Sequence, residues 1–548
     1  MPKPAVDQSD VMIPMSDGAR VAVRIYRPEG PGPFPTLFAA SPYRYDNDDV
    51  PPSMIFYWHE TGPIDFYVER GYAYVHLDVR GTGKSEGEYG FFSRRERRDL
   101  YEVIEWIAAQ PWSSGKIGGI GQSYYAAAQW CMAAERPQHL TCVAPFDGHI
   151  DFYNGWFYQG GIQSQFASVW WNGSVRLANR FPANGSGPRI IEYDLIADLM
   201  RHPIRDDYWE ERTIVDQLSQ VDIPVYSIGI YVKRDIHLDG NIIGYNTVRG
   251  PKKLRLLSTP TLPQALAAFA STAMHEEVLL PFYDCYLKGT RNEYLDRPNV
   301  EFDLCGSSAT LTSTTWPPVG VEYKEFFLGS GPTGSVTSMN DGTLQDEVDL
   351  GVATDQSTEY SYPDSQWAIG PVAHSARGPD LLKRMVTFAS AAFGQDIILA
   401  GWGELVLFVS STRDDANFIV KLSEQFEQPA DDRAKGIQPQ SILISKGWLR
   451  ASQRAIDEAR SVKGGPVHFH TKRSQLVPGQ VVELRIPLTA TAYKVRSGSR
   501  VRIDISCADS TVTDLQFSHA FTPDMVGKDT IHHGPTHPSR LILPTLRT

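Results

Sequence analysis

Ser123 stands between a short apolar run and a helix-prone run, in the stretch KIGGIGQSYYAAAQWCMAAERP of residues 116–137. A nucleophile often occupies this place at a sharp strand-to-helix turn, where neighbouring backbone comes close and small residues such as Gly121 are needed. A serine held there can attack the carbonyl carbon of an ester or amide if a base takes its proton. The G-x-S pattern alone is a weak signal, because a serine that caps a helix N-terminus has the same appearance.

The elements around Ser123 alternate between strand and helix patterns. Strands are expected at 36–43, 72–78, 116–121 and 140–146, after a hairpin over 11–28 that closes at Asp17-Gly18, and helices at 97–110 and 123–135. The alternation resumes with strands at 223–232 and 252–260 and a helix at 274–288. This order predicts a mainly parallel sheet covered by helices on both faces.

Residues 147–220 break the alternation and are rich in aromatic side chains. Eight of them are Phe152, Tyr153, Trp156, Phe157, Tyr158, Phe166, Trp170 and Trp171. One interpretation is the core of a small helical insert; the other is a cap whose rings wall an apolar substrate pocket. The two interpretations of this segment are compatible.

From about residue 320 the sequence changes class. β-branched runs at 404–411, 418–426, 481–495 and 500–510 are separated by turn residues, with few helical periods between them. This pattern predicts an all-β sandwich. The expected domains are a hydrolase-type core at 1–146 and 221–318, a helical cap at 147–220 and a β-sandwich at 319–548.

Four segments together resemble the CocE/NonD family, which includes cocaine esterase, α-amino-acid ester hydrolases and X-prolyl dipeptidyl peptidases. They are SPYRYD (41–46), LDVRGTGKSEGEY (77–89), IEWIAAQPWSSGKIGGIGQSYYAAAQW (104–130) and HPSRLILP (537–544). The resemblance runs nearly end to end. It implies an α/β-hydrolase core with a helical cap inserted after the sixth strand and a C-terminal jelly roll.

The resemblance also implies roles for residues near the turn. The family usually has G-x-S-Y-x-G, so Ser123 matches the acylated nucleophile, whereas Ala126 replaces the last glycine. The backbone N–H of Tyr124 and the hydroxyl of Tyr43 match the two donors to the oxyanion. Two such donors lower the barrier by several kcal/mol, in order of magnitude.

The segment GIYVKRDIHLDGN (229–241) resembles the family motif that holds the catalytic acid. The match implies Asp235 as the acid, with Asp239 as the second choice. The Gly-Trp that precedes the acid in the family is absent here, and two extra residues are inserted.

The family's catalytic histidine motif, Gly-Pro-Trp-x-His after the last core strand, has no counterpart here. That strand ends in LLSTPTLPQAL (256–266), and alignment through Pro260 puts Pro263 at the expected histidine. His149, His237 and His275 fall near the same edge of the predicted sheet and are the histidines that remain as candidates for the base. A packing or surface role is the alternative for each of them.

Composition limits the partners and location of the protein. The net charge of −12 over 548 residues, without a basic block, argues against nucleic acid or an anionic membrane as partner. No secretion signal or membrane-spanning run is recognised, and the five cysteines form no CxxC pair, so we expect a cytoplasmic protein with reduced thiols. No metal-ligand spacing is found, and we expect no cofactor and no metal. The oligomeric state stays open.

Three hypotheses follow for the function. The first is a serine hydrolase that cleaves an ester or amide of a small apolar or aromatic substrate through Ser123, with a non-standard base. The second is the same fold used for non-hydrolytic chemistry, such as a rearrangement, cyclisation, elimination or lyase step. The third is a non-catalytic ligand-binding protein. Labelling of Ser123 by a fluorophosphonate would separate the first from the other two.

Overall fold

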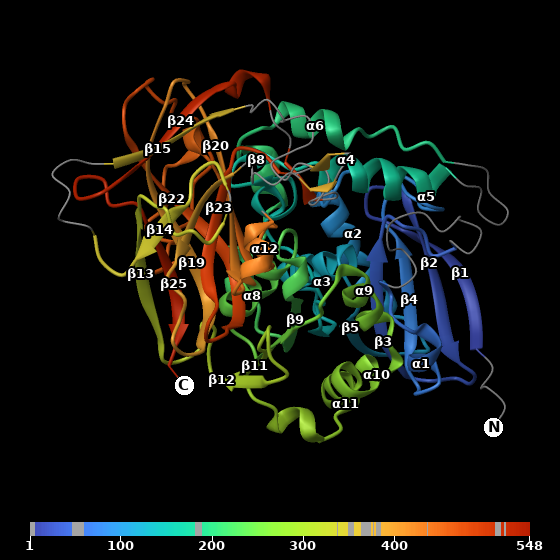
Figure 1. The fold of residues 1–548 in the computed structure, drawn as a ribbon. Coiled ribbons are helices and arrows are strands. Elements are labelled where there is room, and N and C mark those ends of the chain that lie inside the picture. Colours follow the sequence, from blue (N-terminus) through green and yellow to red (C-terminus); the bar gives the residue numbers. More distant parts are fainter. Residues whose placement is uncertain are drawn as a thin grey trace.

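The structure is a computed structural model that describes residues 6–46, 60–180, 189–336, 338–348, 356–362, 374–375, 378–379, 385–435, 437–509, 517–519 and 522–547. Within these ranges the chain forms an α/β part, blue to green in Figure 1, and a β part, yellow to red, which lie side by side. The predicted fold class, an α/β-hydrolase core followed by an all-β domain, is confirmed.

The α/β part is built on a ten-stranded sheet with the order β1-β2-β4-β3-β5-β6-β9-β10-β11-β12. Its strands are β1 (Val6–Pro14), β2 (Arg20–Pro28), β3 (Phe34–Ser41), β4 (Ala73–Asp78), β5 (Ser113–Gly119), β6 (Leu140–Val143), β9 (Val225–Ile230), β10 (Lys252–Leu257), β11 (Val300–Asp303) and β12 (Thr310–Ser313). The predicted hairpin is the antiparallel pair β1 and β2, and pairing is parallel from β4 to β11. The carboxyl ends of the parallel strands therefore share one edge, where open α/β sheets place their ligands.

Helices cover both faces of this sheet. They are α1 (Ile64–Val68), α2 (Arg94–Ala108), α3 (Tyr124–Glu135), α8 (Leu238–Thr247), α9 (Leu262–Ala270), α10 (Thr272–Met274), η5 (His275–Leu279), α11 (Leu280–Lys288) and η6 (Glu293–Asp296). A Cβ on Gly118 of β5 would meet Leu287 of α11, and a Cβ on Gly119 would meet Gln129 of α3. Because successive residues of a strand point to opposite faces, α11 and α3 lie on opposite sides of the sheet.

Short helices between β6 and β9 lie above the sheet in Figure 1. The elements are η1 (Tyr153–Phe157), β7 (Tyr158–Gln159), β8 (Ile162–Gln163), α4 (Phe166–Trp170), η2 (Trp171–Val175), α5 (Arg176–Arg180), α6 (Leu195–Arg201), α7 (Asp207–Arg212) and η3 (Gln217–Gln220); η4 (Tyr231–Lys233) follows β9 directly. The eight aromatic side chains noted in the sequence are all buried here. They form the core of this layer, and only some of them also approach the candidate site described below.

The β part contains an eleven-stranded sheet with the order β15-β24-β19-β22-β21-β20-β23-β18-β14-β13-β25. Its elements are β13 (Val321–Gly329), β14 (Gly342–Gln345), β15 (Gln356–Tyr362), β16 (His374–Ser375), β17 (Gly378–Pro379), β18 (Val386–Ser390), β19 (Ile397–Ser411), β20 (Asn417–Gln425), α12 (Ala430–Ala434), β21 (Ser441–Arg450), η8 (Ala451–Gln453), β22 (Val482–Val495), β23 (Arg500–Ser506), η10 (Pro523–Met525), β24 (Gly527–His533) and β25 (Arg540–Leu546), where β16 and β17 form a separate pair. Because β25 also pairs with β19, the sheet returns on itself around an apolar core.

The two parts share a hydrophobic cluster. Leu238 and Ile242 of α8 are buried in it together with Ala490 and Ala492 of β22. Asp239 of the same helix accepts hydrogen bonds at Oδ1 from the Trp402 indole at 3.0 Å and from the Ala490 N–H at 3.1 Å. Apolar and polar contacts thus both join α8 to the β part.

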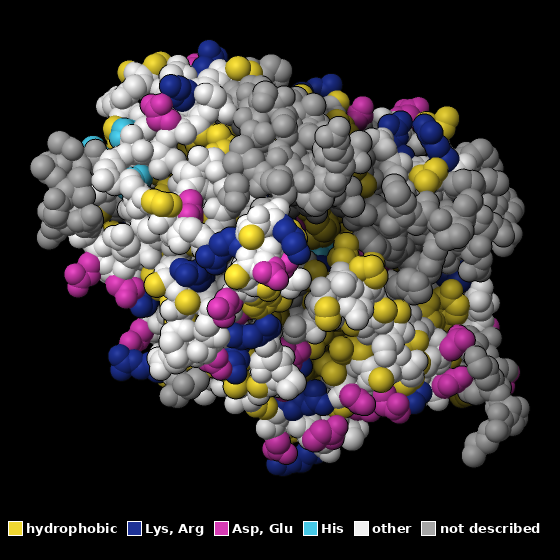
Figure 2. Space-filling model, in the orientation of Figure 1, with side chains coloured by type: hydrophobic (Ala, Val, Ile, Leu, Met, Phe, Trp, Pro, Cys, Tyr) yellow, Lys and Arg dark blue, Asp and Glu magenta, His cyan; other side chains and the backbone are white. Residues whose placement is uncertain are grey.

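The surface in Figure 2 mixes Lys and Arg with Asp and Glu, and apolar side chains gather over α9. No helix within the described ranges is long and apolar enough to cross a membrane. All five cysteines have free thiols.

Candidate active site

Ser123 occupies a strained turn between β5 and α3. Its φ of 62° and ψ of −116° lie in a region that residues other than glycine rarely adopt. Its N–H points to the carbonyl oxygens of Phe146 at 3.1 Å and Asp147 at 3.0 Å. Such a conformation costs about 1–3 kcal/mol and persists where the surroundings impose it. This is the geometry of a nucleophile elbow, with the side chain at the carboxyl edge of the sheet.

Two close approaches explain the small residues of this turn. A Cβ on Gly121, whose φ is 124°, would lie 2.3 Å from the Tyr125 Cβ. A Cβ on Gly148, in the loop after β6, would lie 2.7 Å from the Ala126 Cβ. The family motif has its last glycine at the position of Ala126, and here the facing loop supplies the glycine instead.

The side chains of the two residues expected to supply the oxyanion donors pack against each other. The rings of Tyr43 and Tyr124 pack with centroids 6.1 Å apart, and the Tyr43 oxygen accepts a hydrogen bond from the Trp170 indole at 2.8 Å. Burial, together with the charge of Glu60, raises the pKa of Tyr43 well above its usual value, so this hydroxyl keeps the proton that a donor needs. Tyr124 is the first residue of α3, and its N–H has no partner within its own helix. Its hydroxyl donates to Glu96 Oε1 at 2.5 Å, so its backbone N–H is the group left to serve an oxyanion.

The imidazole of His275 is hydrogen-bonded through both nitrogens. Nε2 lies 2.6 Å from the Phe269 carbonyl oxygen, which can only accept, so Nε2 carries the proton. Nδ1 then accepts from the Tyr67 hydroxyl at 2.7 Å. The ring also lies against Gly62, where a Cβ would come within 2.5 Å of its Cε1. Neither nitrogen is left to take a proton from Ser123.

His149 is enclosed between the layer above the sheet and α8. Its Nδ1 accepts a hydrogen bond from the Asp151 N–H at 3.0 Å. A Cβ on Gly155 would fall 2.2 Å from the ring, and one on Gly240 would lie 2.5 Å from the His149 Cα. Burial lowers the pKa of His149 to about 4, so the ring is neutral.

His237 is buried at the start of α8, and its ring centroid lies 5.7 Å from that of Trp156. Neither of its ring nitrogens has a hydrogen-bond partner among the described residues. Burial lowers the pKa of His237 well below its usual value, and the nearby Lys233 adds to the effect. His237 thus lacks the carboxylate that orients the histidine of a catalytic triad.

The expected acid faces an ammonium group rather than an imidazole. Asp235 Oδ2 lies 3.3 Å from the Nζ of Lys446 on β21, and its backbone carbonyl accepts from the Gln159 side chain at 2.8 Å. Asp239, the second choice, is bonded to the β part as described above. The structure therefore brings Ser123, Tyr43 and Tyr124 together but pairs neither aspartate with a candidate histidine.

A buried Asp–His pair occurs elsewhere, at the boundary with the β part. His519 Nδ1 lies 2.6 Å from Asp509 Oδ2, and its Nε2 lies 3.0 Å from Gln159 Oε1. The amide group of Gln159 donates to the carbonyls of Gly155 and Asp235, which turns its oxygen toward His519. Both nitrogens of His519 are therefore hydrogen-bonded, one to Asp509 and the other to Gln159.

Three ionisable groups beside Ser123 had not been singled out in the sequence. Glu60, Asp147 and Lys233 are buried, and the Glu60 carbonyl accepts from the Gln122 N–H at 2.8 Å. Lys233 Nζ lies 3.4 Å from Asp147 Oδ2, to which the Gln122 side chain also donates at 3.1 Å. The three groups thus lie beside Gln122, the residue that precedes Ser123.

Desolvation controls the charge of this cluster. Burial raises the pKa of the Glu60 carboxyl to about 8; Lys233 and hydrogen bonding with the Ser123 side chain lower it in part, and Asp147 raises it. Burial likewise raises the pKa of Asp147, against the effect of Lys233. The sequence contained one signal for the cluster, a lysine directly after the apolar strand in IGIYVKRD, within the segment where the family pattern breaks.

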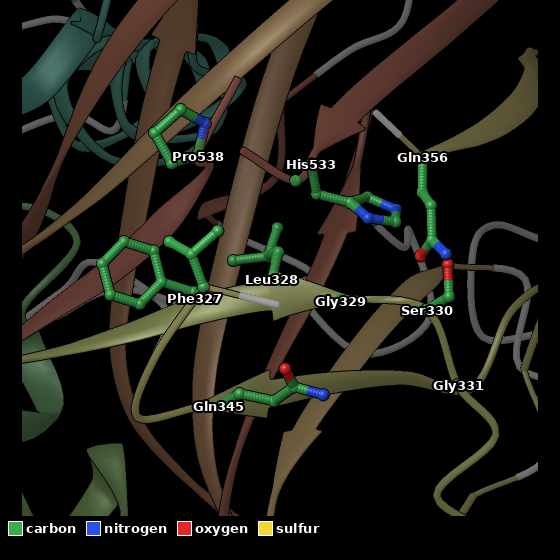
Figure 3. A pocket seen from close by; sticks show the side chains of 11 residues that line it. Phe327, Leu328, Gly329, Ser330, Gly331, Gln345, Gln356, His533 and Pro538 are labelled. Atoms are coloured by element: carbon green, nitrogen blue, oxygen red, sulfur yellow. The ribbon is translucent and has the colours of Figure 1, made fainter. Parts of the chain in front are cut away.

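A separate pocket of about 220 Å³ lies in the β part (Figure 3). It is lined by Phe327, Leu328, Gly329, Ser330, Gly331, Gln345, Val348, Gln356, His533, Gly534 and Pro538. Its imidazole, His533, is bonded through Nε2 to the Thr358 hydroxyl at 3.1 Å, and no carboxylate is present in the lining. The lining thus offers a hydroxyl group, on Ser330, and an imidazole, but no carboxylate to orient that imidazole.

Comparison with known proteins yields two matches that together span most of the chain. Residues 17–261 match the X-Pro dipeptidyl-peptidase (S15) family, and residues 291–542 match the X-Pro dipeptidyl-peptidase C-terminal non-catalytic domain. The chain belongs to this family. Its members described as CocE/NonD hydrolases share the same two-part architecture, and the chain is accordingly a serine hydrolase of the ester- and peptide-cleaving type.

Individual S15 relatives are similar over nearly the whole chain. Cocaine esterase of Rhodococcus sp. (strain MB1 Bresler) is 24% identical, with 98% of each chain covered. A putative Xaa-Pro dipeptidyl-peptidase of Streptomyces avermitilis is 23% identical over 90% of this chain and 77% of the relative. The crystal structure of a CocE/NonD family hydrolase from Staphylococcus aureus has a TM-score of 0.81 at 24% identity and covers 99% of this chain and 94% of its own.

The two S15 family matches leave residues 262–290 between them. This interval holds α9, α10, η5 and α11, and it follows the strand after which the family motif would place its histidine. Phe269 of α9 is buried here, with its ring 4.8 Å from that of Phe146 and 4.8 Å from that of His275. An aromatic contact thus fills the space between α9 and the loop after β6.

Proposed function

We propose that this chain cleaves a carboxylic ester or amide of a small apolar or aromatic substrate through an acyl-enzyme on Ser123. In this proposal the Ser123 hydroxyl attacks the carbonyl carbon and expels the alcohol or amine, and water then releases the acid. The Tyr43 hydroxyl and the Tyr124 N–H donate to the oxyanion of each tetrahedral intermediate.

The observation that carries the proposal is the strained backbone of Ser123 at the strand-to-helix turn. A serine that only caps a helix needs no positive φ, because N-cap residues adopt extended backbone angles. The Ser123 side chain also makes no capping hydrogen bond to α3. The strain is therefore explained better by a nucleophile than by a helix cap.

The substrate class is inferred from the aromatic layer above the sheet. Trp170 contacts the proposed oxyanion donor Tyr43, and Trp156 packs against His237 at the same edge. Indole rings favour apolar or aromatic groups by burial and stacking. The names of two similar proteins, cocaine esterase and α-amino-acid ester hydrolase, support an ester as the bond that is cleaved.

A fluorophosphonate probe tests the proposal because it phosphonylates activated serines. We expect one adduct per chain, located on Ser123 by peptide mass analysis and absent from the Ser123→Ala variant. Folded protein without an adduct across pH 6–9.5 would overturn the proposal. Release of p-nitrophenol from aromatic and short aliphatic p-nitrophenyl esters would then rank the acyl groups.

Non-hydrolytic chemistry is the second candidate, favoured by one observation. With a pKa of about 8, the Glu60 carboxyl is protonated at neutral pH and can act as a general acid. In that case the oxyanion donors would stabilise an enolate. An unlabelled Ser123 in a protein that still binds apolar carbonyl compounds would support this candidate.

A further inference from the structure

We propose that Glu60 is the general base that takes the proton of Ser123. This inference rests on the proposed function, since it concerns the acylation of the same serine. It supplies a base from a loop before α1, far in the sequence from the strand that carries the family's histidine motif.

Position is the first argument. The Glu60 carbonyl oxygen accepts the N–H of Gln122, the residue before the nucleophile, and a Cβ on Gly121 would lie 3.1 Å from the same oxygen. The backbone of Glu60 is thus fixed against the elbow. Glu60 is 1% exposed, the Ser123 side chain favours its charged form, and Oε2 has no hydrogen-bond partner among the described residues. The carboxyl therefore has acceptor capacity where the proton must go.

The charges around Glu60 are the second argument. Lys233 faces it from η4 and favours the carboxylate; Asp147 faces it from the loop after β6 and opposes ionisation. The phenols of Tyr43, just after β3, and of Tyr125, on α3, face it, and burial together with the Glu60 charge raises the pKa of both. One cation thus stabilises the ionised base, while the neighbouring phenols stay protonated.

The competing histidines are the third argument. Both nitrogens of His275 are hydrogen-bonded, and among the described residues no carboxylate is hydrogen-bonded to the ring of His149 or His237. Among the described residues, Glu60 is the carboxyl group whose charged form the Ser123 side chain favours.

The proton balance of the reaction closes with Glu60 alone. As Ser123 Oγ bonds to the carbonyl carbon, its proton passes to the Glu60 carboxylate, and the C=O electron pair moves to the oxygen. The intermediate collapses, the bond to the leaving oxygen or nitrogen breaks, and Glu60 returns its proton to the leaving group. Water attacks the acyl-enzyme in the same way: its proton goes to Glu60 and then to the departing Ser123 oxygen.

The test measures the rate of fluorophosphonate labelling of the full chain between pH 6 and 9.5. We expect the rate of the parent to rise with pH and to level off above a midpoint near 8, as Glu60 ionises. Glu60→Gln keeps the shape of the side chain but cannot accept the proton. It should lower the plateau rate about 100-fold or more and remove the rise, as general-base catalysis contributes 10²–10⁴-fold. Glu60→Asp should keep a rise with pH at a reduced rate.

Two further variants separate chemistry from folding. Asp529→Asn also removes a buried carboxyl with a raised pKa, but on β24 of the β part, and should leave the rate profile unchanged. Lys233→Met removes the cation that stabilises the Glu60 carboxylate and should shift the midpoint to higher pH. If Lys233 had only a structural role, its substitution would not move the midpoint of the labelling rate.

The outcomes distinguish this inference from the proposed function. A parent protein that does not label would contradict the proposed function itself. Labelling of Glu60→Gln at the parent rate and with the parent pH profile would overturn Glu60 as the base. So would loss of the rise with pH in His149→Ala, His237→Ala or His59→Ala, where His59 precedes Glu60 in the sequence and lies outside the described residues.

Discussion

At the scale of single residues, the chemistry of Ser123 depends on which neighbouring group holds a proton at neutral pH. Glu60 is protonated there because burial penalises its charged form more than Lys233 favours it. The group therefore serves as an acid below pH 8 and as a base above it. The optimum of a hydrolase that uses Glu60 should accordingly lie on the alkaline side.

The same pKa predicts a pH dependence of stability. Between pH 4.5, the ordinary value, and about 8, folded Glu60 keeps a proton that the unfolded chain has lost. The free energy of unfolding therefore falls as pH rises through this window, by at most about 1.4 kcal/mol per pH unit. Glu60→Gln abolishes this term, so the stability of the variant relative to the parent should rise from pH 5 to pH 8. Urea unfolding followed by tryptophan fluorescence at several pH values measures it.

Glu96→Gln serves as the comparison, because burial raises the pKa of Glu96 to about 7. The stability of Glu96→Gln relative to the parent should rise with pH and level off about one pH unit below the point at which that of Glu60→Gln levels off. Parallel stability curves for Glu60→Gln and the parent across pH 5–8 would contradict a raised pKa at Glu60.

At the scale of elements, the elbow depends on two close contacts between α3 and the loop after β6. The Ser123 N–H bonds to the carbonyls of Phe146 and Asp147, and Gly148 lies over Ala126. The strained turn is thus held from outside its own segment. A substitution in the loop after β6 should therefore change the backbone geometry at Ser123 without replacing Ser123 itself.

Gly148→Ala should destabilise the protein by about 1–3 kcal/mol, the usual cost of overpacking, and slow acylation of Ser123. The added methyl group would lie 2.7 Å from the Ala126 Cβ. The double variant Gly148→Ala/Ala126→Gly should recover only a small part of both losses, because it removes the Ala126 Cβ but leaves the Ala126 carbonyl carbon and the Ala127 nitrogen 2.8 and 2.9 Å from the added methyl group. Thermal unfolding and labelling rates of the two single variants and the double variant measure the coupling. Strictly additive effects would show that the two residues do not interact.

At the scale of the whole molecule, the β part is joined to the core next to the candidate site. Lys446 of β21 lies beside Asp235, and Gln159 connects the Asp235 carbonyl to His519. The role of Asp235 as a catalytic acid stays a prediction; its observed partner comes from the β part. The contacts between the α/β part and the β part therefore involve the same segment, around Asp235, as the contacts at the candidate site.

Lys446→Met should destabilise the protein by about 3–5 kcal/mol, because it leaves the buried Asp235 carboxylate without its cation. Asp235→Asn combined with Lys446→Met should cost less than Lys446→Met alone. Thermal unfolding of the single and double variants measures this. Activity separates the two roles of Asp235, since loss of a triad acid costs about 10⁴ in kcat whereas loss of a contact between the two parts would spare turnover in the folded protein.

The sequence by itself determined the architecture and marked Ser123 as the candidate nucleophile. Strand and helix periods predicted the parallel sheet, the hairpin at Asp17-Gly18 and the all-β part, because burial of apolar residues at fixed periods acts locally along the chain. The G-x-S turn between a strand and a helix likewise marked Ser123. The domain boundaries at 146, 220 and 318 remain predictions.

Only the tertiary structure decided which groups surround Ser123. Glu60, Asp147 and Lys233 are separated by 86 or more positions at their closest pairing, yet they meet where three strands end at one edge of the sheet. The charges of these three groups follow from their burial and from their effects on one another. Neither the burial nor these effects can be obtained from the spacing of the residues along the sequence. The glycine opposite Ala126 and the ammonium opposite Asp235 were also supplied by distant segments, because close packing in a folded chain is made between elements rather than along them.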